Sequence, residues 1–205
     1  PPSWGVLYLV GLYFADVLGR AGAGRYDQLA SSFCCCPAVW SRCWIRRRTS
    51  SIWPPSTSTT SPFFFIGRNI DYAMGLEGSL KLKEISYIHS EAYAAGELKH
   101  GTISLIEPGT LVVALATYGA LFDKTMSNIV EVRSRGADVV ALTTEAHREA
   151  MESQASGIML IPELDPMLMP SLAVLPLQMF AYYVALNRGC DIDKPRNLAK
   201  SVTVE

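Results

Sequence analysis

Residues 110–116 read TLVVALA, a run of aliphatic side chains with no polar residue after Thr110. A run this short and this apolar is typical of a strand that is buried on both faces of a parallel sheet. Working outward along the chain, similar runs stand at residues 63–66, 138–143 and 157–161. The sequence therefore predicts a sheet that contains these four buried strands.

Helical segments separate these runs. A helix with Asp71 as its N-cap is predicted up to about residue 90, and others over residues 122–135 and 167–188, each followed by a glycine. Strands that alternate with helices predict an α/β fold, here a doubly wound parallel sheet flanked by helices. Ligands of such sheets bind at the carboxyl ends of the strands, where Gly67-Arg68 would lie.

The chain changes character before this region. A buried helix is predicted over residues 4–19 and a short helix over residues 25–33. The stretch that follows has four cysteines, three tryptophans and four arginines but no Asp, Glu, Lys, Gly or Leu, so it is expected to be irregular. A mistranslated segment and a lineage-specific insertion are the two interpretations of it. The predicted organisation is an N-terminal unit, this irregular segment, an α/β domain and a tail, at residues 1–32, 33–62, 63–194 and 195–205.

Composition excludes some classes of function. The formal net charge is −1, with 49% hydrophobic and 18% charged residues, which is typical of a soluble globular protein. The only basic run is Arg46–Arg48, so no nucleic-acid partner is expected. Trp4–Ala15 is too short to span a bilayer, and Leu172–Leu186 is interrupted by Pro176, so both are predicted to be core helices. We expect a cytoplasmic protein without a membrane partner.

The five cysteines predict neither a disulfide framework nor a zinc site. Three of them are adjacent and no histidine lies near them, which does not fit the paired spacing of zinc ligands. Free thiols are therefore expected, and no metal. These cysteines are Cys34, Cys35, Cys36, Cys43 and Cys190.

Three charged residues share one stripe of the helix predicted after Asp71. At 100° per residue, Glu77, Lys81 and Glu84 fall within about 60° of one another. Leucine, isoleucine and tyrosine flank this stripe, and serines occupy the opposite face. An ordinary surface helix carries its charges opposite the apolar face. The stripe is either a simple surface ion pair or part of a desolvated cleft, where burial raises the pKa of a glutamate and lowers that of a lysine.

Two other residues are candidates for chemistry. His100 lies in a polar loop that ends at Gly101, where a histidine is usually structural or merely exposed. Lys200 lies in the tail after Pro195 and is either a solvated terminal lysine or an amine that forms a Schiff base with a carbonyl substrate. Sequence spacing does not choose between these interpretations.

Two segments carry a family resemblance. LEGSLKLKEISYIHSEAYAAGELKHGTISLI at residues 76–106 and CDIDKPRNLAKSVTVE at residues 190–205 resemble the carboxyl-terminal part of the isomerising glutamine–fructose-6-phosphate aminotransferases. The resemblance covers residues 63–205 and implies a sugar isomerase (SIS) fold. Residues 1–32 weakly resemble the last helix of the preceding SIS lobe. The implied activity converts fructose 6-phosphate to glucosamine 6-phosphate with ammonia from glutamine, and it needs no cofactor.

The resemblance also implies a role for each candidate. It identifies Lys200 as the Schiff-base lysine, Glu84 as the carboxylate that moves a proton between C1 and C2, and His100 as the histidine that assists ring opening from the partner subunit of a homodimer. Residues that support the substrate site would be Glu77, Lys81, Leu198 and Ala199.

Two features of the family have no counterpart in these residues. Nothing in the chain corresponds to the glutaminase domain or to the loop that binds the sugar phosphate in the first SIS lobe. The chain alone is therefore expected to be inactive as a synthase. The alternative is a non-catalytic SIS-fold module that binds a sugar phosphate or dimerises.

Overall fold

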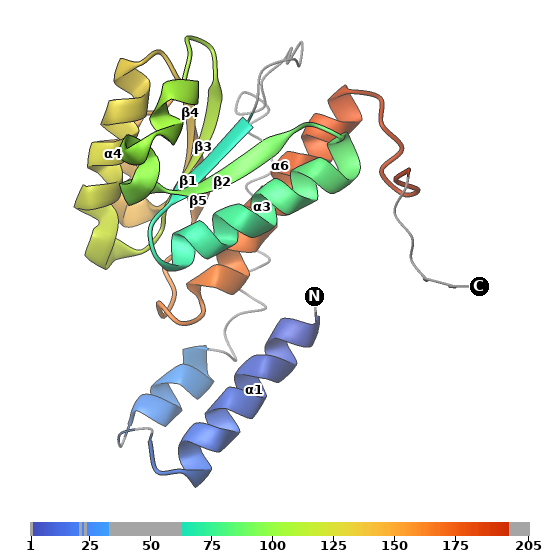
Figure 1. Ribbon diagram of the computed structural model, residues 1–205. Helices are drawn as coiled ribbons and strands as arrows, with labels where there is room; N and C mark the ends of the chain where they lie inside the picture. The colour runs from blue at the N-terminus through green and yellow to red at the C-terminus, as the bar shows by residue number, and fades with distance from the viewer. Residues whose placement is uncertain (1, 21, 23, 33–62, 197–205) are drawn as a thin grey trace.

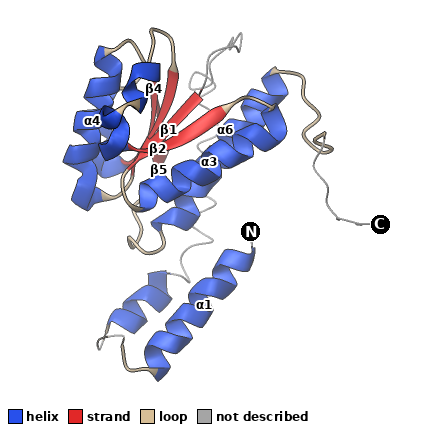
Figure 2. Cartoon of the chain, in the orientation of Figure 1, coloured by secondary structure: helices blue, strands red, loops and turns tan. Residues whose placement is uncertain are grey.

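The computed structural model describes residues 2–20, 22, 24–32 and 63–196. Its central feature is a five-stranded parallel sheet with helices on both faces (Figures 1 and 2). The strand order is β2-β1-β3-β4-β5, which confirms the predicted α/β fold. The strands are β1 (Phe63–Gly67), β2 (Ser90–Ala94), β3 (Leu111–Ala116), β4 (Asp138–Thr144) and β5 (Gly157–Ile161). The main helices of this domain are α3 (Ile70–Ser86), α4 (Phe122–Ser134), α5 (Arg148–Glu152) and α6 (Met169–Asn187).

Strand β2 was not predicted. The predicted helix continued to about residue 90, whereas α3 ends at Ser86 because Tyr87 takes the left-handed conformation with φ 60°. The chain then reverses, and Ser90–Ala94 pairs with β1 along the edge of the sheet. An edge strand is not buried on both faces, so SEAYA lacks the continuous apolar run that marks the other four strands.

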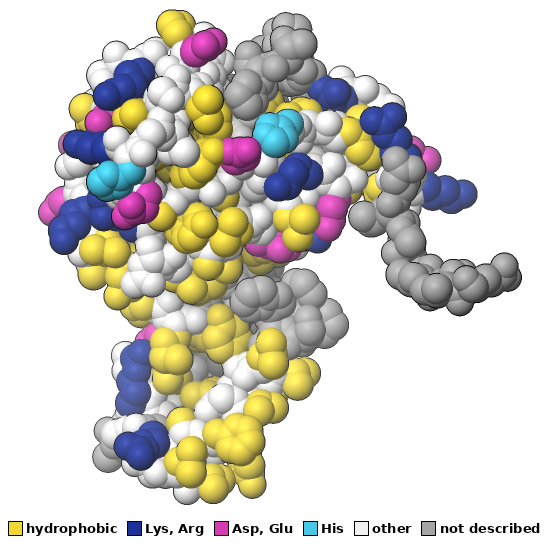
Figure 3. All heavy atoms as spheres, in the orientation of Figure 1, with side chains coloured by type: hydrophobic (Ala, Val, Ile, Leu, Met, Phe, Trp, Pro, Cys, Tyr) yellow, Lys and Arg dark blue, Asp and Glu magenta, His cyan; other side chains and the backbone are white. Residues whose placement is uncertain are grey.

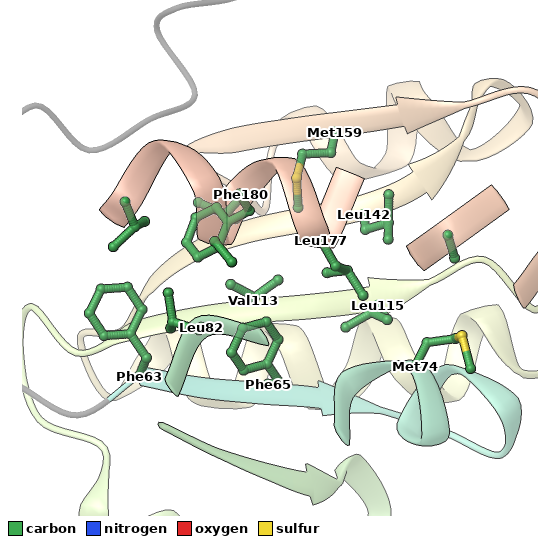
Figure 4. Close-up of a cluster of buried hydrophobic side chains, with 14 of the residues drawn as sticks. Phe63, Phe65, Met74, Leu82, Val113, Leu115, Leu142, Met159, Leu177 and Phe180 are labelled. Atoms are coloured by element: carbon green, nitrogen blue, oxygen red, sulfur yellow. The ribbon is translucent and has the colours of Figure 1, made fainter. Parts of the chain in front are cut away.

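The alternation of side chains divides the core into two layers. Phe63 and Phe65 point to the face covered by α3 and α6, whereas Phe64 and Ile66 point to the opposite face, covered by α4 and α5. Figure 4 shows the first layer, in which the ring of Phe180 from α6 meets Phe65 edge to face. Both faces of the sheet are therefore closed by helices.

The buried face of α3 differs from the prediction. Gly75, Gly78 and Ser79 face the core, whereas Leu76 and Leu80 are 48% and 44% exposed. A Cβ atom at Gly78 would lie 3.0 Å from Cε1 of Phe65. At these three positions the helix lies close to the sheet, so small residues form the contact there and Leu76 and Leu80 turn outward, while Met74 and Leu82 of the same helix are buried in the core. The face opposite the charged stripe, where the serines were predicted, is therefore the buried one: Ser79 and Ser86 are 2% and 0% exposed.

Helix α6 is long and apolar enough to satisfy a length-and-composition test for a membrane span. It nevertheless lies in the core, where Leu172, Leu177 and Phe180 are fully buried. This agrees with the prediction of a core helix, and Pro176 lies inside it without ending it.

Helix α1 (Pro2–Val17) and a helix at residues 25–32 lie against the domain at the start of α6. The hydroxyl of Tyr8 donates to the carbonyl oxygen of Met167 at 2.9 Å, and Arg25 pairs with Asp165 at 2.6 Å. Most of the large apolar side chains of α1 are exposed, and Figure 3 shows hydrophobic side chains gathered over this helix. The prediction of a buried helix was therefore wrong for α1. Residues 33–62 and their four cysteines lie outside the described residues.

Candidate functional site

Lys81 lies between two glutamates on the partly exposed face of α3. Its Nζ is 2.8 Å from Oε2 of Glu84 and 3.8 Å from Oε1 of Glu77. The three side chains are between 24% and 31% exposed. The spacing of i, i+4 and i+7 therefore brings them together as predicted, on a helix that the sheet and α6 hold in place.

The pKa of Lys81 distinguishes the two interpretations of this group. The hydrogen bond with Glu84 raises the pKa of Lys81, and the charge of Glu77 reinforces this, although partial burial acts in the opposite direction. The lowered lysine pKa that the desolvated-cleft interpretation implied is wrong, because direct contact with a carboxylate outweighs desolvation. Lys81 is therefore held as an ammonium and is not available as a neutral amine.

His100 ends the 3-10 helix Ala95–His100, which follows β2. Its side chain is 75% exposed, and its Nε2 lies 3.7 Å from Oε2 of the equally exposed Glu97. This position is polar and solvated, as predicted.

The structure does not bring His100 to the Glu84 end of α3. Strand β2 starts beside the middle of α3, where the Ser79 hydroxyl contacts Ser90, and runs toward the start of that helix. At Gly96 the chain has reached Arg68, since a Cβ atom there would lie 3.0 Å from the Arg68 guanidinium. Glu84 lies in the opposite direction along α3. Within one chain, His100 therefore follows a strand that runs toward the start of α3, whereas Glu84 lies near the end of that helix.

Arg68 lies at the carboxyl edge of the sheet, where ligand binding was expected, and is hydrogen-bonded within the domain. Arg68 follows β1, and its guanidinium donates to Oδ1 of Asn128 on α4 at 2.9 and 3.1 Å. This contact and the packing over Gly96 occupy the arginine with structural partners.

Asp71 is the residue at this edge that sequence reasoning assigned incorrectly. The N-cap position is Asn69, and Asp71 lies in the first turn of α3. Its buried carboxylate accepts hydrogen bonds from the amide of Thr117 at 2.9 Å, the hydroxyl of Thr117 at 2.5 Å and the amide of Tyr118 at 3.1 Å. Burial raises the pKa of Asp71, although these bonds act to lower it. Asp71 therefore fixes the start of α3 to the loop after β3, a contact 46 residues apart that no local pattern signals.

Three predicted site residues cannot be placed. Lys200, Leu198 and Ala199 lie outside the described residues. The described chain ends at Arg196, whose backbone amide donates to the hydroxyl of Tyr87 at 2.8 Å. The start of the tail therefore lies at the carboxyl end of α3, near Glu84.

Metal binding has no candidate in the described part of the chain. Within residues 2–20, 22, 24–32 and 63–196, no three His, Cys, Asp or Glu side chains come together as possible ligands. Cys190 is a free thiol.

The chain is similar to known aminotransferases. The glutamine–fructose-6-phosphate aminotransferase (isomerizing) of Clostridium tetani is 48% identical over 199 residues, which cover 97% of this chain and 33% of that protein. The enzyme of the same name from Symbiobacterium thermophilum is 59% identical over 142 residues, 69% of this chain and 23% of that protein. The chain thus spans about a third of the length of the curated relatives it matches.

Solved structures and a family model agree with this similarity. The C-terminal domain of glucosamine-fructose-6-phosphate aminotransferase from Francisella tularensis superposes with a TM-score of 0.71 at 32% identity, covering 84% of this chain and 48% of that chain. The model of the SIS domain matches residues 61–188, which include all five strands and the charged stripe on α3. This chain therefore belongs to the SIS domain family.

Proposed function

We propose that this chain forms the isomerase part of a glutamine–fructose-6-phosphate aminotransferase. The observation that carries the proposal is the ion-paired group on α3, in which Lys81 contacts both Glu84 and Glu77. It stands on a helix that belongs to the matched SIS domain, in a chain 48% identical to an aminotransferase of this name. A carboxylate held in place on a helix can take a proton from a substrate carbon and return it.

The proposed chemistry begins with an imine. The neutral amine of Lys200 attacks the C2 carbonyl of open-chain fructose 6-phosphate, and one water molecule leaves. Lys81 is unsuited to this step because Glu84 holds it in the ammonium form. In the longer protein, ammonia then displaces the Lys200 amine from C2. Glu84 takes a proton from C1 of the resulting imine and delivers it to C2, which converts the ketose skeleton to the aldose skeleton and leaves a free amino group at C2. Glu77 supports the site by holding Lys81 from the other side.

Ring opening of the sugar is proposed for His100 of a second subunit. His100 is exposed and lies toward the opposite end of α3 from Glu84, so a homodimer in which it reaches the partner's site fits this arrangement. Leu198 and Ala199 would border the substrate next to Lys200. Release of ammonia from glutamine, and with it the whole conversion to glucosamine 6-phosphate, is proposed for the longer protein, in the cytoplasm.

Reductive trapping tests the imine. The chain is incubated with millimolar fructose 6-phosphate and borohydride, digested and examined by mass spectrometry. The proposal predicts a reduced sugar phosphate on Lys200, which Lys200→Arg abolishes. Lys194→Arg is the matched control, because Lys194 is an exposed lysine at the start of the tail and should leave the label in place. An unlabelled Lys200 at saturating sugar would overturn the proposal in favour of a non-catalytic SIS module.

A further inference from the structure

Helix α3 presents a mainly apolar line to solvent. Its most exposed residues are Ala73, Leu76, Leu80 and Lys83, and every other position of the helix is at least partly buried. We call these four residues the outer seam. Leu76 and Leu80, at its middle, are 48% and 44% exposed. An ordinary surface helix carries polar residues opposite its buried face, so within the described part of the chain these leucines lack the apolar partner that such a line normally has.

The spacing of the outer seam is that of helices that pair with one another. Its residues follow at intervals of three, four and three, which is the spacing of the a and d positions of a coiled coil. This order is the same when it is read backwards. A second α3 that runs antiparallel therefore meets the outer seam position for position, with Leu76 facing Leu80 and Ala73 facing Lys83. A twofold axis would pass between the two leucines.

Size and charge favour the antiparallel direction over the parallel one. In a parallel pair, Lys83 of one copy would face Lys83 of the other, and like charges placed opposite each other repel. In the antiparallel pair, the small Ala73 lies opposite each lysine and leaves room for its stem. Glu77 and Lys81, which pair with each other beside the outer seam, then gather around the twofold axis as two charges of each sign.

We infer that the outer seam is the contact surface of a homodimer, in which α3 packs antiparallel against α3 of a second copy. A second copy of this chain fits the surface because the spacing, the match of small to large side chains and the balance of charge are all self-complementary. The helix has 17 residues, about 25 Å, and the leucines lie near its middle, so both halves of α3 can take part.

The direction of pairing also deepens the proposed function, and this step rests on that function. An antiparallel pair places the start of one α3 beside the end of the other. Glu84 lies near the end of α3, whereas β2 carries the chain toward the start of that helix before it reaches His100. The homodimer thus brings the part of the domain that carries His100 toward Glu84 of the other copy.

Sedimentation velocity tests the surface. We expect the unmodified chain to form a dimer at micromolar concentration. Leu80→Asp should raise the dimer dissociation constant at least about tenfold, because the contact then holds two carboxylates in place of two leucines. Val130→Asp is the matched control and should leave the constant unchanged, since Val130 is 45% exposed on α4, which covers the opposite face of the sheet (Figure 1). Circular dichroism shows whether each variant stays folded.

Disulfide formation tests the direction independently. In the antiparallel pair, Ala73 of one copy faces Lys83 of the other, whereas the two copies of either residue lie about 15 Å apart along the helix axis, too far for a disulfide. An oxidised mixture of Ala73→Cys and Lys83→Cys chains should therefore give a 73–83 bond in mass spectrometry, and neither variant alone should link to itself. Val130→Cys, mixed with either variant, should give no such bond.

Three results would overturn the inference: a monomeric unmodified chain, unchanged association of Leu80→Asp, or a mixture without the 73–83 bond. These outcomes are separable from those of the proposed function, because they report the contact surface whereas borohydride trapping reports the imine. A dimer with the 73–83 bond but without trapping would remove the function and keep the outer seam. Trapping by a chain that is monomeric would remove the outer seam and keep the imine chemistry.

Discussion

Gly67 lies at the point where β1 turns into α3, and replacing it by alanine should weaken the connection that positions the charged helix. A Cβ atom at Gly67 would lie 2.6 Å from the backbone carbon of Asp71 and 2.8 Å from both the carbonyl oxygen of Asp71 and the amide nitrogen of Tyr72. All three contacts are with backbone atoms, so no side-chain rotation relieves them. The start of α3 must move away from β1.

The size of the effect follows from this geometry. Excess volume in a packed interior costs about 1–3 kcal/mol, and the upper part of that range applies where backbone must shift. We therefore expect Gly67→Ala to lower the free energy of unfolding by about 3 kcal/mol. With a urea m-value of about 2 kcal/mol/M, the unfolding midpoint measured by circular dichroism should fall by about 1.5 M.

Gly11→Ala is the matched control for this measurement. It adds the same methyl group at a helical glycine of α1 that has no heavy atom within 4 Å of the added carbon. This variant should not lose stability, because alanine favours a helix over glycine. A loss below about 1 kcal/mol for Gly67→Ala would refute the close approach of α3 to β1.

Three further perturbations test the local physics. Asn69→Gly should raise the free energy of unfolding by about 1 kcal/mol in a denaturant titration. Asn69 has φ 53° and ψ −122°, a conformation that favours glycine. A loss of stability would contradict this. The pKa of Asp71 is raised in the folded state, so the folded protein binds a proton there more readily than the unfolded chain does. The wild type should therefore gain stability relative to Asp71→Asn as pH falls through that raised pKa. A difference in unfolding free energy that does not change with pH would contradict this. Lys81→Met should change the free energy of unfolding by less than about 1 kcal/mol near neutral pH, because the ion pair is partly exposed. The stabilisation from Lys81 should disappear as pH rises through its raised pKa. A larger loss of stability in thermal unfolding would contradict the partly exposed ion pair.

Much of the sheet could be predicted because parallel strands that are buried on both faces appear in the sequence as continuous apolar runs. Residues 111–116 are buried without exception, so every position must be apolar, and this run is visible in the sequence alone. Strand β2 has no such apolar run, because its four residues after Ser90 are only partly buried. A single left-handed residue, Tyr87, decides where the preceding helix ends, and tyrosine gives no local signal for that conformation.

The face of α3 was misassigned because hydrophobicity was taken as the measure of burial. Gly78 and Ser79 are buried since the helix packs closely on Phe65, and closeness selects small residues rather than apolar ones. The grouping of Lys81 with its two glutamates was nevertheless predictable from spacing, because it depends only on helical geometry. The direction of the Lys81 pKa was not, since it depends on a 2.8 Å contact that spacing does not determine.

The positions of His100 and of the tail depend on contacts between distant segments. The path from β2 to His100 follows from pairing with β1, and the start of the tail follows from the contact between Tyr87 and Arg196, 109 residues apart. The family resemblance implies roles for His100 and for the tail, but it does not predict where they lie in a single chain.

Hydrogen exchange at C1 of fructose 6-phosphate tests the role of Glu84 most directly. The chain is incubated with the sugar in deuterium oxide, and loss of the C1 proton signal is followed by nuclear magnetic resonance. We expect exchange with the unmodified chain and exchange at least about 10²-fold slower with Glu84→Gln. Glu152→Gln, which alters an exposed glutamate on α5, should exchange at the unmodified rate. Equal rates for Glu84→Gln and the unmodified chain, or no exchange by the unmodified chain, would contradict the assignment of proton transfer to this helix.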